Sequence, residues 1–173
     1  MSLRSRTAGA VLALAVPFAL AAVPADAAPV PVADPFIWTD LTPTYTATTD
    51  YQYEPFAITD GYTPTGGCAH DAQTGKGGSG YHYINAANIG SLDPAEPAGL
   101  LYETDSDGGR ALVGVEWIVR AGTGSAAPTL FGQTFQGPAE LDGVGSVYTL
   151  HAWIWKDNPS GLFAPWNPMV TCS

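Results

Sequence analysis

The chain has 173 residues, of which 13% are charged, and its formal net charge is −10. Such an acidic composition excludes nucleic acid and anionic membrane surfaces as partners, because both are bound through basic patches. The length suits one domain with a modest hydrophobic core.

The first 27 residues have the pattern of an export signal. Arg4 and Arg6 precede an almost wholly apolar run over residues 8–23, and Ala-Asp-Ala at 25–27 matches the small-x-small pattern that signal peptidase recognises. No later run approaches the roughly 18 apolar residues that a membrane-spanning helix needs. We therefore expect cleavage after Ala27 and a secreted protein with four basic and 15 acidic residues, a formal charge of −11.

The segment that follows gives weak structural signals. Residues 28–50 are rich in Pro, Thr and Ala, which predicts an extended or flexible arm. Residues 46–60 favour at most one short helix, because Pro55 interrupts them. Residues 61–67 are typical of a turn, and residues 69–80 of a glycine-rich loop that lacks the Gly-Lys-Ser/Thr order of phosphate-binding loops. We expect a single β-rich domain over residues 51–173.

Four later segments have the β-branched and aromatic composition of strands: residues 81–85, 99–103, 110–120 and 147–155. An Asp/Gly-rich turn at 105–109 predicts a hairpin over residues 100–120. Residues 129–135 could form a further strand or a loop. The sequence therefore predicts a mainly β fold, with α+β still open, in which an antiparallel sheet curls into a small barrel or half-barrel.

Two cysteines, Cys68 and Cys172, lie in the part of the chain expected to be exported. An even pair in an oxidising compartment usually forms a disulfide. The bond would close a loop of about 100 residues, for which the chain-entropy model gives up to ~4–5 kcal/mol of stabilisation.

Three strand-like segments, 81–84, 113–119 and 148–155, each carry one acidic or histidine side chain among apolar or aromatic neighbours: His82, Glu116 and His151. A buried charge must be paired, coordinated or neutralised, because leaving it alone costs several kcal/mol or more. Strand alternation places Leu112 on the same face as Glu116. It places Trp153 and Trp155 on the face of His151.

These residue types support more than one chemistry. Two imidazoles and one or two carboxylates facing into a barrel would suit a divalent transition metal ion such as Zn, Mn, Fe or Cu. The same groups could act as an acid/base pair on a small organic ligand held against aromatic side chains. Candidates for that ligand pocket are Tyr83, Trp153 and Trp155. The sequence assigns no catalytic residue.

Five motifs give a further indication: GYHYIN at 80–85, LYE at 101–103, LVGVEW at 112–117, LFGQ at 130–133 and LHAWIWKDNPSGLF at 150–163. Together with the ending WNPMVTC at 166–172, they resemble a family of small exported bacterial proteins, mostly from actinobacteria. The chain departs from the family at Ala86, where the family has proline, and in its glycine-rich 69–80 loop. The resemblance implies a shared fold and a shared His/Glu set, in which Glu103 joins the other three as a metal ligand. It implies no activity.

Three functions remain open at this point. The protein could bind a divalent metal ion, or it could bind a small organic molecule through the aromatic and His/Glu groups. It could also be an exported structural or interaction domain, in which a buried His/Glu network only stabilises the fold. Convergence of the His and Glu side chains in space is the observation that bears most directly on this choice.

Overall fold

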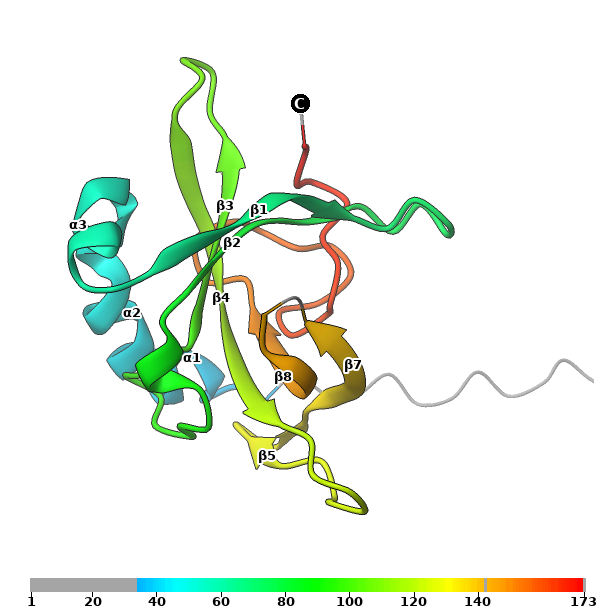
Figure 1. Cartoon of the computed structure of the whole chain (residues 1–173). Coiled ribbons are helices and arrows are strands. Elements are labelled where there is room, and N and C mark those ends of the chain that lie inside the picture. Colours follow the sequence, from blue (N-terminus) through cyan, green and yellow to red (C-terminus); the bar gives the residue numbers. More distant parts are fainter. Residues whose placement is uncertain (1–33, 142, 173) are drawn as a thin grey trace, which may run out of the picture. The chain divides into compact units, whose positions relative to one another are not determined.

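The computed structural model describes residues 34–141 and 143–172, so the expected export signal lies outside the described residues. Six strands form one antiparallel sheet in the order β1-β2-β3-β4-β8-β7, and this sheet curls into a half-barrel (Figure 1). Its strands are β1 (Thr63–His70), β2 (Gly78–Ile84), β3 (Gly99–Thr104), β4 (Arg110–Arg120), β7 (Gln136–Leu141) and β8 (Gly145–Ala152). A separate ribbon consists of β5 (Thr129–Leu130) and β6 (Gln133–Thr134). The predicted mainly β fold with a curled antiparallel sheet is confirmed.

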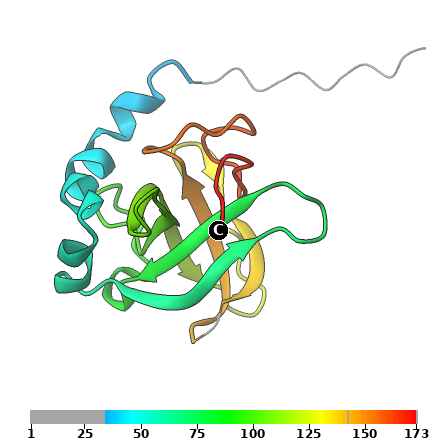
Figure 2. The ribbon, with the colours of Figure 1, turned by 90° about the horizontal axis from the view of Figure 1, so that it is seen from above.

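Short helices line one side of the sheet (Figure 2). They are α1 (Ile37–Asp40), α2 (Thr42–Thr48), the 3-10 helix η1 (Thr49–Gln52) and α3 (Glu54–Thr59), and a 3-10 turn η2 (Ala86–Asn88) follows β2. The structure therefore has helix where the composition of residues 28–50 suggested a flexible arm, and it has more than the one short helix expected. Among the described residues, no helix combines the length and the apolar character needed to cross a membrane.

The positions of the prolines and threonines explain this difference. Pro43 and Pro55 lie in the first turn of α2 and α3, where a proline starts a helix rather than interrupting it. Ile37, Leu41 and Thr44 follow helical spacing and are buried. Because threonine is polar, this pattern is hard to recognise as a buried helix face in the sequence.

The two strands that the sequence did not predict are the two edges of the sheet. β1 contains Pro64, Gly66 and Gly67, and its pairing with β2 is irregular between Pro64 and Cys68. β7 contains Gly137 and is largely exposed. Edge strands tolerate glycine, proline and irregular pairing, so their composition resembles that of turns. The strand predicted at 147–155 begins at Gly145 and ends at Ala152.

The two faces of the sheet are buried by different groups. One face carries the large core cluster that includes Val115 and Trp117, and α1, α2 and α3 lie over this cluster. The opposite face carries two smaller clusters. They consist of Ile84, Ala98, Ile118 and Val147, and of Leu101, Val113, Trp153 and Val170.

A β-bulge in β4 alters the predicted alternation. Gly114 and Leu112 lie opposite consecutive residues of β3, so Val113 is an extra residue. Leu112 packs in the cluster of Val115, and Val113 packs in a cluster of the opposite face. The prediction that Leu112 shares the face of Glu116 is therefore wrong, because strict alternation cannot anticipate an inserted residue.

Candidate metal centre

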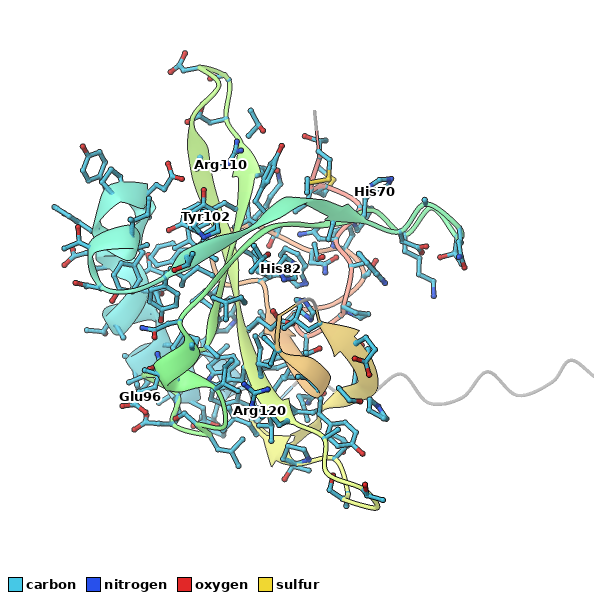
Figure 3. All side chains as sticks on the ribbon, viewed as in Figure 1. His70, His82, Glu96, Tyr102, Arg110 and Arg120 are labelled. Atoms are coloured by element: carbon cyan, nitrogen blue, oxygen red, sulfur yellow. A yellow bond between two sulfur atoms is a disulfide. The ribbon has the colours of Figure 1, made fainter. Side chains whose placement is uncertain are left out.

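Three ionisable side chains from three strands meet on the concave face of the curled sheet. His82 comes from β2, Glu116 from β4 and His151 from β8, and Glu116 lies directly opposite His151 in the β4–β8 pair. Because β3 runs between β2 and β4, His82 and Glu116 would be about 9.5 Å apart in a flat sheet. The curl of the sheet brings them together over β3, and Figure 3 shows His82 among the central strands.

Gly99 of β3 leaves the space for this contact. It lies opposite Glu116, and a Cβ atom on residue 99 would be 3.1 Å from both Cβ and Oε2 of Glu116. Side chains rarely approach so closely, so any side chain here would push the carboxylate away. The missing side chain lets the carboxylate of Glu116 extend across β3 toward His82.

The carboxylate of Glu116 lies between the two imidazoles. Its Oε2 is 3.3 Å from Nδ1 of His82, and its Oε1 is 3.5 Å from Nε2 of His151. One potential ligand atom from each of the three residues lies within 4.8 Å of the others. The group could therefore hold a metal ion. His70 is exposed at the end of β1 and lies apart from this group (Figure 3).

Two polar atoms of the group are buried without a hydrogen-bond partner in the described part of the chain: Oε2 of Glu116 and Nε2 of His151. Glu116 is only 2% exposed and His151 only 7%. Leaving a buried polar atom unpaired costs about 1–3 kcal/mol, and more for a charged group. The described residues therefore leave two buried polar atoms of this group without a partner.

The protonation states suit a cation. Burial in apolar surroundings lowers the pKa of His151, although Glu116 acts in the opposite direction, so this imidazole is neutral at pH 7 and has a lone pair to share. Burial alone would raise the pKa of Glu116, but the two histidines that face it lower that pKa more strongly. The group then offers one carboxylate from Glu116 and one neutral imidazole from His151, which are the ligand forms that metals bind.

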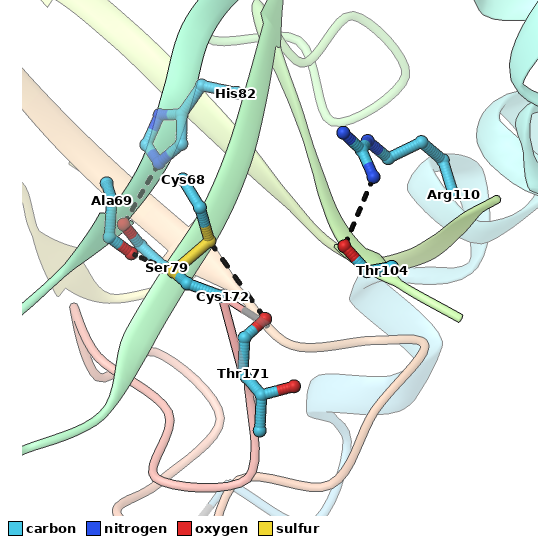
Figure 4. Close-up of a disulfide and its surroundings, with 8 residues drawn as sticks. All are labelled: Cys68, Ala69, Ser79, His82, Thr104, Arg110, Thr171 and Cys172. Carbon is cyan, nitrogen blue, oxygen red and sulfur yellow. Dashed lines mark hydrogen bonds between the residues drawn. A yellow bond between two sulfur atoms is a disulfide. The ribbon is translucent and has the colours of Figure 1, made fainter. Parts of the chain in front are cut away.

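The surroundings fix both imidazole rings. Nε2 of His82 lies 3.0 Å from Oγ of Ser79 (Figure 4). The ring of His151 stacks on Trp153 with 6.2 Å between centroids and an interplanar angle of 11°. The two smaller apolar clusters of this face lie on the same side of the sheet as the group.

Glu103, expected as a fourth ligand, is not part of this group. Both of its carboxylate oxygens accept hydrogen bonds from Nζ of Lys156, at 2.6 and 2.7 Å. In β3, Glu103 lies four residues beyond Gly99, which is about 13 Å along a strand. No sequence pattern indicated this ion pair, because Lys156 follows β8 and is distant from Glu103 along the chain.

Of the three aromatic side chains expected in a ligand pocket, only Trp153 lies beside the group. Tyr83 packs in the large core cluster on the opposite face, and its hydroxyl donates a hydrogen bond to Glu54. Trp155 packs against the same cluster and stacks on Tyr45 with 4.1 Å between centroids. β8 ends at Ala152, so the alternation that placed Trp155 beside His151 does not continue that far.

The predicted disulfide is confirmed: Cys68 of β1 is bonded to Cys172, with 5.4 Å between the two Cα atoms (Figure 4). Next to it, Asn167 and Gly78 exchange two backbone hydrogen bonds of 3.1 and 2.9 Å. The C-terminal segment is thereby held against the start of β2, close to Ser79.

Sequence reasoning missed two residues that shape the group, Gly99 and Ser79. Gly99 opens a predicted strand, where an unexpected glycine signals close approach of another group. Ser79 lies between two glycines in a segment expected to be a loop. The pattern Gly-Ser-Gly immediately before a strand was the available signal, since it is compatible with a bulge.

No family model, curated protein or solved structure matches this chain.

Proposed function

We propose that the protein binds one divalent transition metal ion through His82, Glu116 and His151. The observation that carries this proposal is the pair of unpartnered buried atoms, Oε2 of Glu116 and Nε2 of His151. A hydrogen-bond network that only stabilised the fold would satisfy these atoms, because an unmet buried acceptor is costly. A single cation bound between the three side chains satisfies both Oε2 of Glu116 and Nε2 of His151.

The distances support a metal ion over hydrogen bonding. Zn²⁺ lies about 2.0–2.2 Å from imidazole nitrogen and carboxylate oxygen, which separates two ligand atoms of a tetrahedral site by about 3.4 Å. The contacts of Glu116 with His82 and His151 are 3.3 and 3.5 Å. A charge-assisted N–H···O bond would be shorter, about 2.7–2.9 Å. The group spans up to 4.8 Å, so small side-chain rotations close it around the ion.

The type of ligand sets the class of metal. Imidazole and carboxylate together suit Zn²⁺, Mn²⁺, Fe²⁺ or Cu²⁺ and are a poor match for Ca²⁺, which takes six to eight oxygen ligands. The one carboxylate and the two imidazoles offset only part of the charge of a divalent ion. A further small ligand, such as water, completes the coordination shell.

Metal titration of the protein, purified without chelator or affinity tag, tests this function. Thermal and urea unfolding are measured with added Zn²⁺, Mn²⁺ or Cu²⁺, for the natural sequence, for Glu116→Gln and for Glu103→Gln. We expect the natural protein and the Glu103 variant to gain about 2.7 kcal/mol at a metal concentration 100-fold above Kd. We expect Glu116→Gln to gain almost nothing.

Two results would count against the metal site. One is a natural protein that carries no transition metal and shows no gain in stability on metal addition. The other is an equal response in all three proteins, which would place the binding elsewhere. A large loss of stability in Glu116→Gln, together with no metal response in the natural protein, would favour a purely structural network.

We also propose that the protein works outside the cell. The disulfide suits an oxidising compartment, and the sequence of residues 1–27 matches an export signal. Mass spectrometry of the protein recovered from culture medium should give a chain that begins close to residue 28. Retention of the intact N-terminus inside the cell would contradict export.

A further inference from the structure

Ser79 faces His82 because β2 contains a bulge at its start. In a regular strand, residues three apart point to opposite faces. Here Ala69 of β1 lies opposite Gly80, and the next residue, His70, lies opposite Gly78, so Ser79 is the extra residue. Gly80 has φ +84°, a conformation that glycine adopts without strain. The bulge turns Ser79 onto the face of His82.

The bulge is closely packed, which fixes the serine. A Cβ atom on Gly80 would be 2.3 Å from the carbonyl oxygen of Tyr102, and one on Gly78 would be 3.1 Å from the carbonyl oxygen of Val170. Ser79 itself is 3% exposed. Within the described residues, the hydroxyl of Ser79 has one hydrogen bond, to Nε2 of His82 at 3.0 Å.

This contact bears on how His82 could bind a metal. A neutral imidazole carries its proton on one nitrogen and a lone pair on the other. If Nε2–H donates to the hydroxyl oxygen of Ser79, the lone pair of Nδ1 points at Oε2 of Glu116, 3.3 Å away. Two lone pairs at that distance repel each other unless a cation lies between them.

We propose that Ser79 is a positioning residue of the metal site. It accepts the Nε2–H of His82 and so holds Nδ1 as the ligand atom. The inference rests on the metal-binding function proposed above and adds a residue that does not touch the ion. Hydrogen-bond partners of metal-bound histidines generally fix the ring and raise its basicity, and their loss costs about 10–100-fold in metal affinity.

Two measurements on the whole protein test this role. Nitrogen-15 NMR of the zinc-loaded protein should show His82 coordinated through Nδ1, with a proton on Nε2. Competition with a chelator should then show zinc affinity lowered about 10–100-fold in Ser79→Ala. Ser91→Ala is the control, since the hydroxyl of Ser91 is bonded to Glu96 at an exposed position away from the site. It should bind zinc like the natural protein.

The outcomes separate this inference from the function on which it rests. Absence of zinc binding in the natural protein would overturn the metal site itself. Zinc binding with coordination through Nε2 of His82, or with equal affinity in Ser79→Ala and the natural protein, would overturn only the role of Ser79. The NMR result does not depend on whether the variant folds.

Discussion

Glu116 reaches across a strand because residue 99 has no side chain. The carboxylate, which is almost fully buried, lies over Gly99 and faces an imidazole on either side. The geometry of the group thus depends on one glycine that offers no chemistry of its own. Lone ionisable residues in apolar strands identify the three side chains that meet, whereas Glu103 forms its pair with Lys156 elsewhere.

Replacing Gly99 by alanine should weaken metal binding. The new Cβ would lie 3.1 Å from Oε2 of Glu116, so the carboxylate must move by a few tenths of an ångström. Displacements of this size at positioned ligands are expected to cost roughly 10-fold in affinity, the lower end of the effect of losing a supporting contact. Gly67→Ala is the control, because a Cβ at residue 67 meets nothing within 4 Å. Competition with a chelator measures the metal affinity of both variants. Equal affinity in Gly99→Ala and in the natural protein would contradict this account of Gly99.

At the scale of elements, the N-terminal helices are attached to the sheet by tyrosine hydroxyls. Tyr83 of β2 donates to Glu54 at the start of α3, and Tyr102 of β3 donates to the carbonyl oxygen of Tyr51 in η1 at 2.7 Å. These bonds lie on the face opposite the candidate metal centre. They explain why a region without a strong helical pattern in its sequence is helical, since tertiary contacts outweigh weak propensity.

The Tyr83–Glu54 contact predicts a dependence of stability on alkaline pH. Burial, and then the hydrogen bond to Glu54, raise the pKa of Tyr83 to about 12. Because the pKa in the unfolded chain is about 10, this contribution is complete below about pH 10 and is lost as pH rises toward 12. Tyr83→Phe should therefore lose less stability than the natural protein between pH 8 and pH 11.

Urea unfolding at the two pH values measures this difference. At pH 8, Tyr83→Phe should be less stable by about 1–3 kcal/mol, because a hydrogen bond to a carboxylate is lost. Tyr53→Phe, whose ring is exposed, is the control and should match the natural protein. If Tyr83→Phe and the natural protein lost equal amounts of stability between pH 8 and pH 11, the pH dependence would not come from the Tyr83–Glu54 contact.

Across the whole molecule, the sequence predicted the central strands and missed the edges and helices. Residues 110–120 combine β-branched and aromatic side chains on both faces, and they form β4 with the predicted bounds. β1 has the composition of a turn, because an edge strand needs few apolar residues. The bulge at Val113 could not be predicted, since an inserted residue depends on the partner strand rather than on its own sequence. For the bulge at Ser79, the Gly-Ser-Gly pattern was the one available signal.

The candidate site draws on distant parts of the chain. His82 and His151 are brought to Glu116 by strand pairing and by the curl of the sheet. The disulfide joins two cysteines that lie 104 positions apart in the sequence. Together with the backbone hydrogen bonds between Asn167 and Gly78, it holds the C-terminal segment over the start of β2. Such a closure is expected to stabilise the fold by up to ~4–5 kcal/mol in the chain-entropy model. The sequence indicated the residues, and only the fold indicates their convergence.

Anomalous X-ray scattering from crystals soaked in Zn²⁺, measured on both sides of the zinc absorption edge, tests the metal site most directly. We predict one strong peak between Nδ1 of His82, Nε2 of His151 and the carboxylate of Glu116, with ligand distances of about 2.0–2.2 Å. Crystals of Glu116→Gln soaked in the same way should show no peak at this position. Crystals of the natural protein with no anomalous density at this position, or with zinc only at surface residues, would contradict the account.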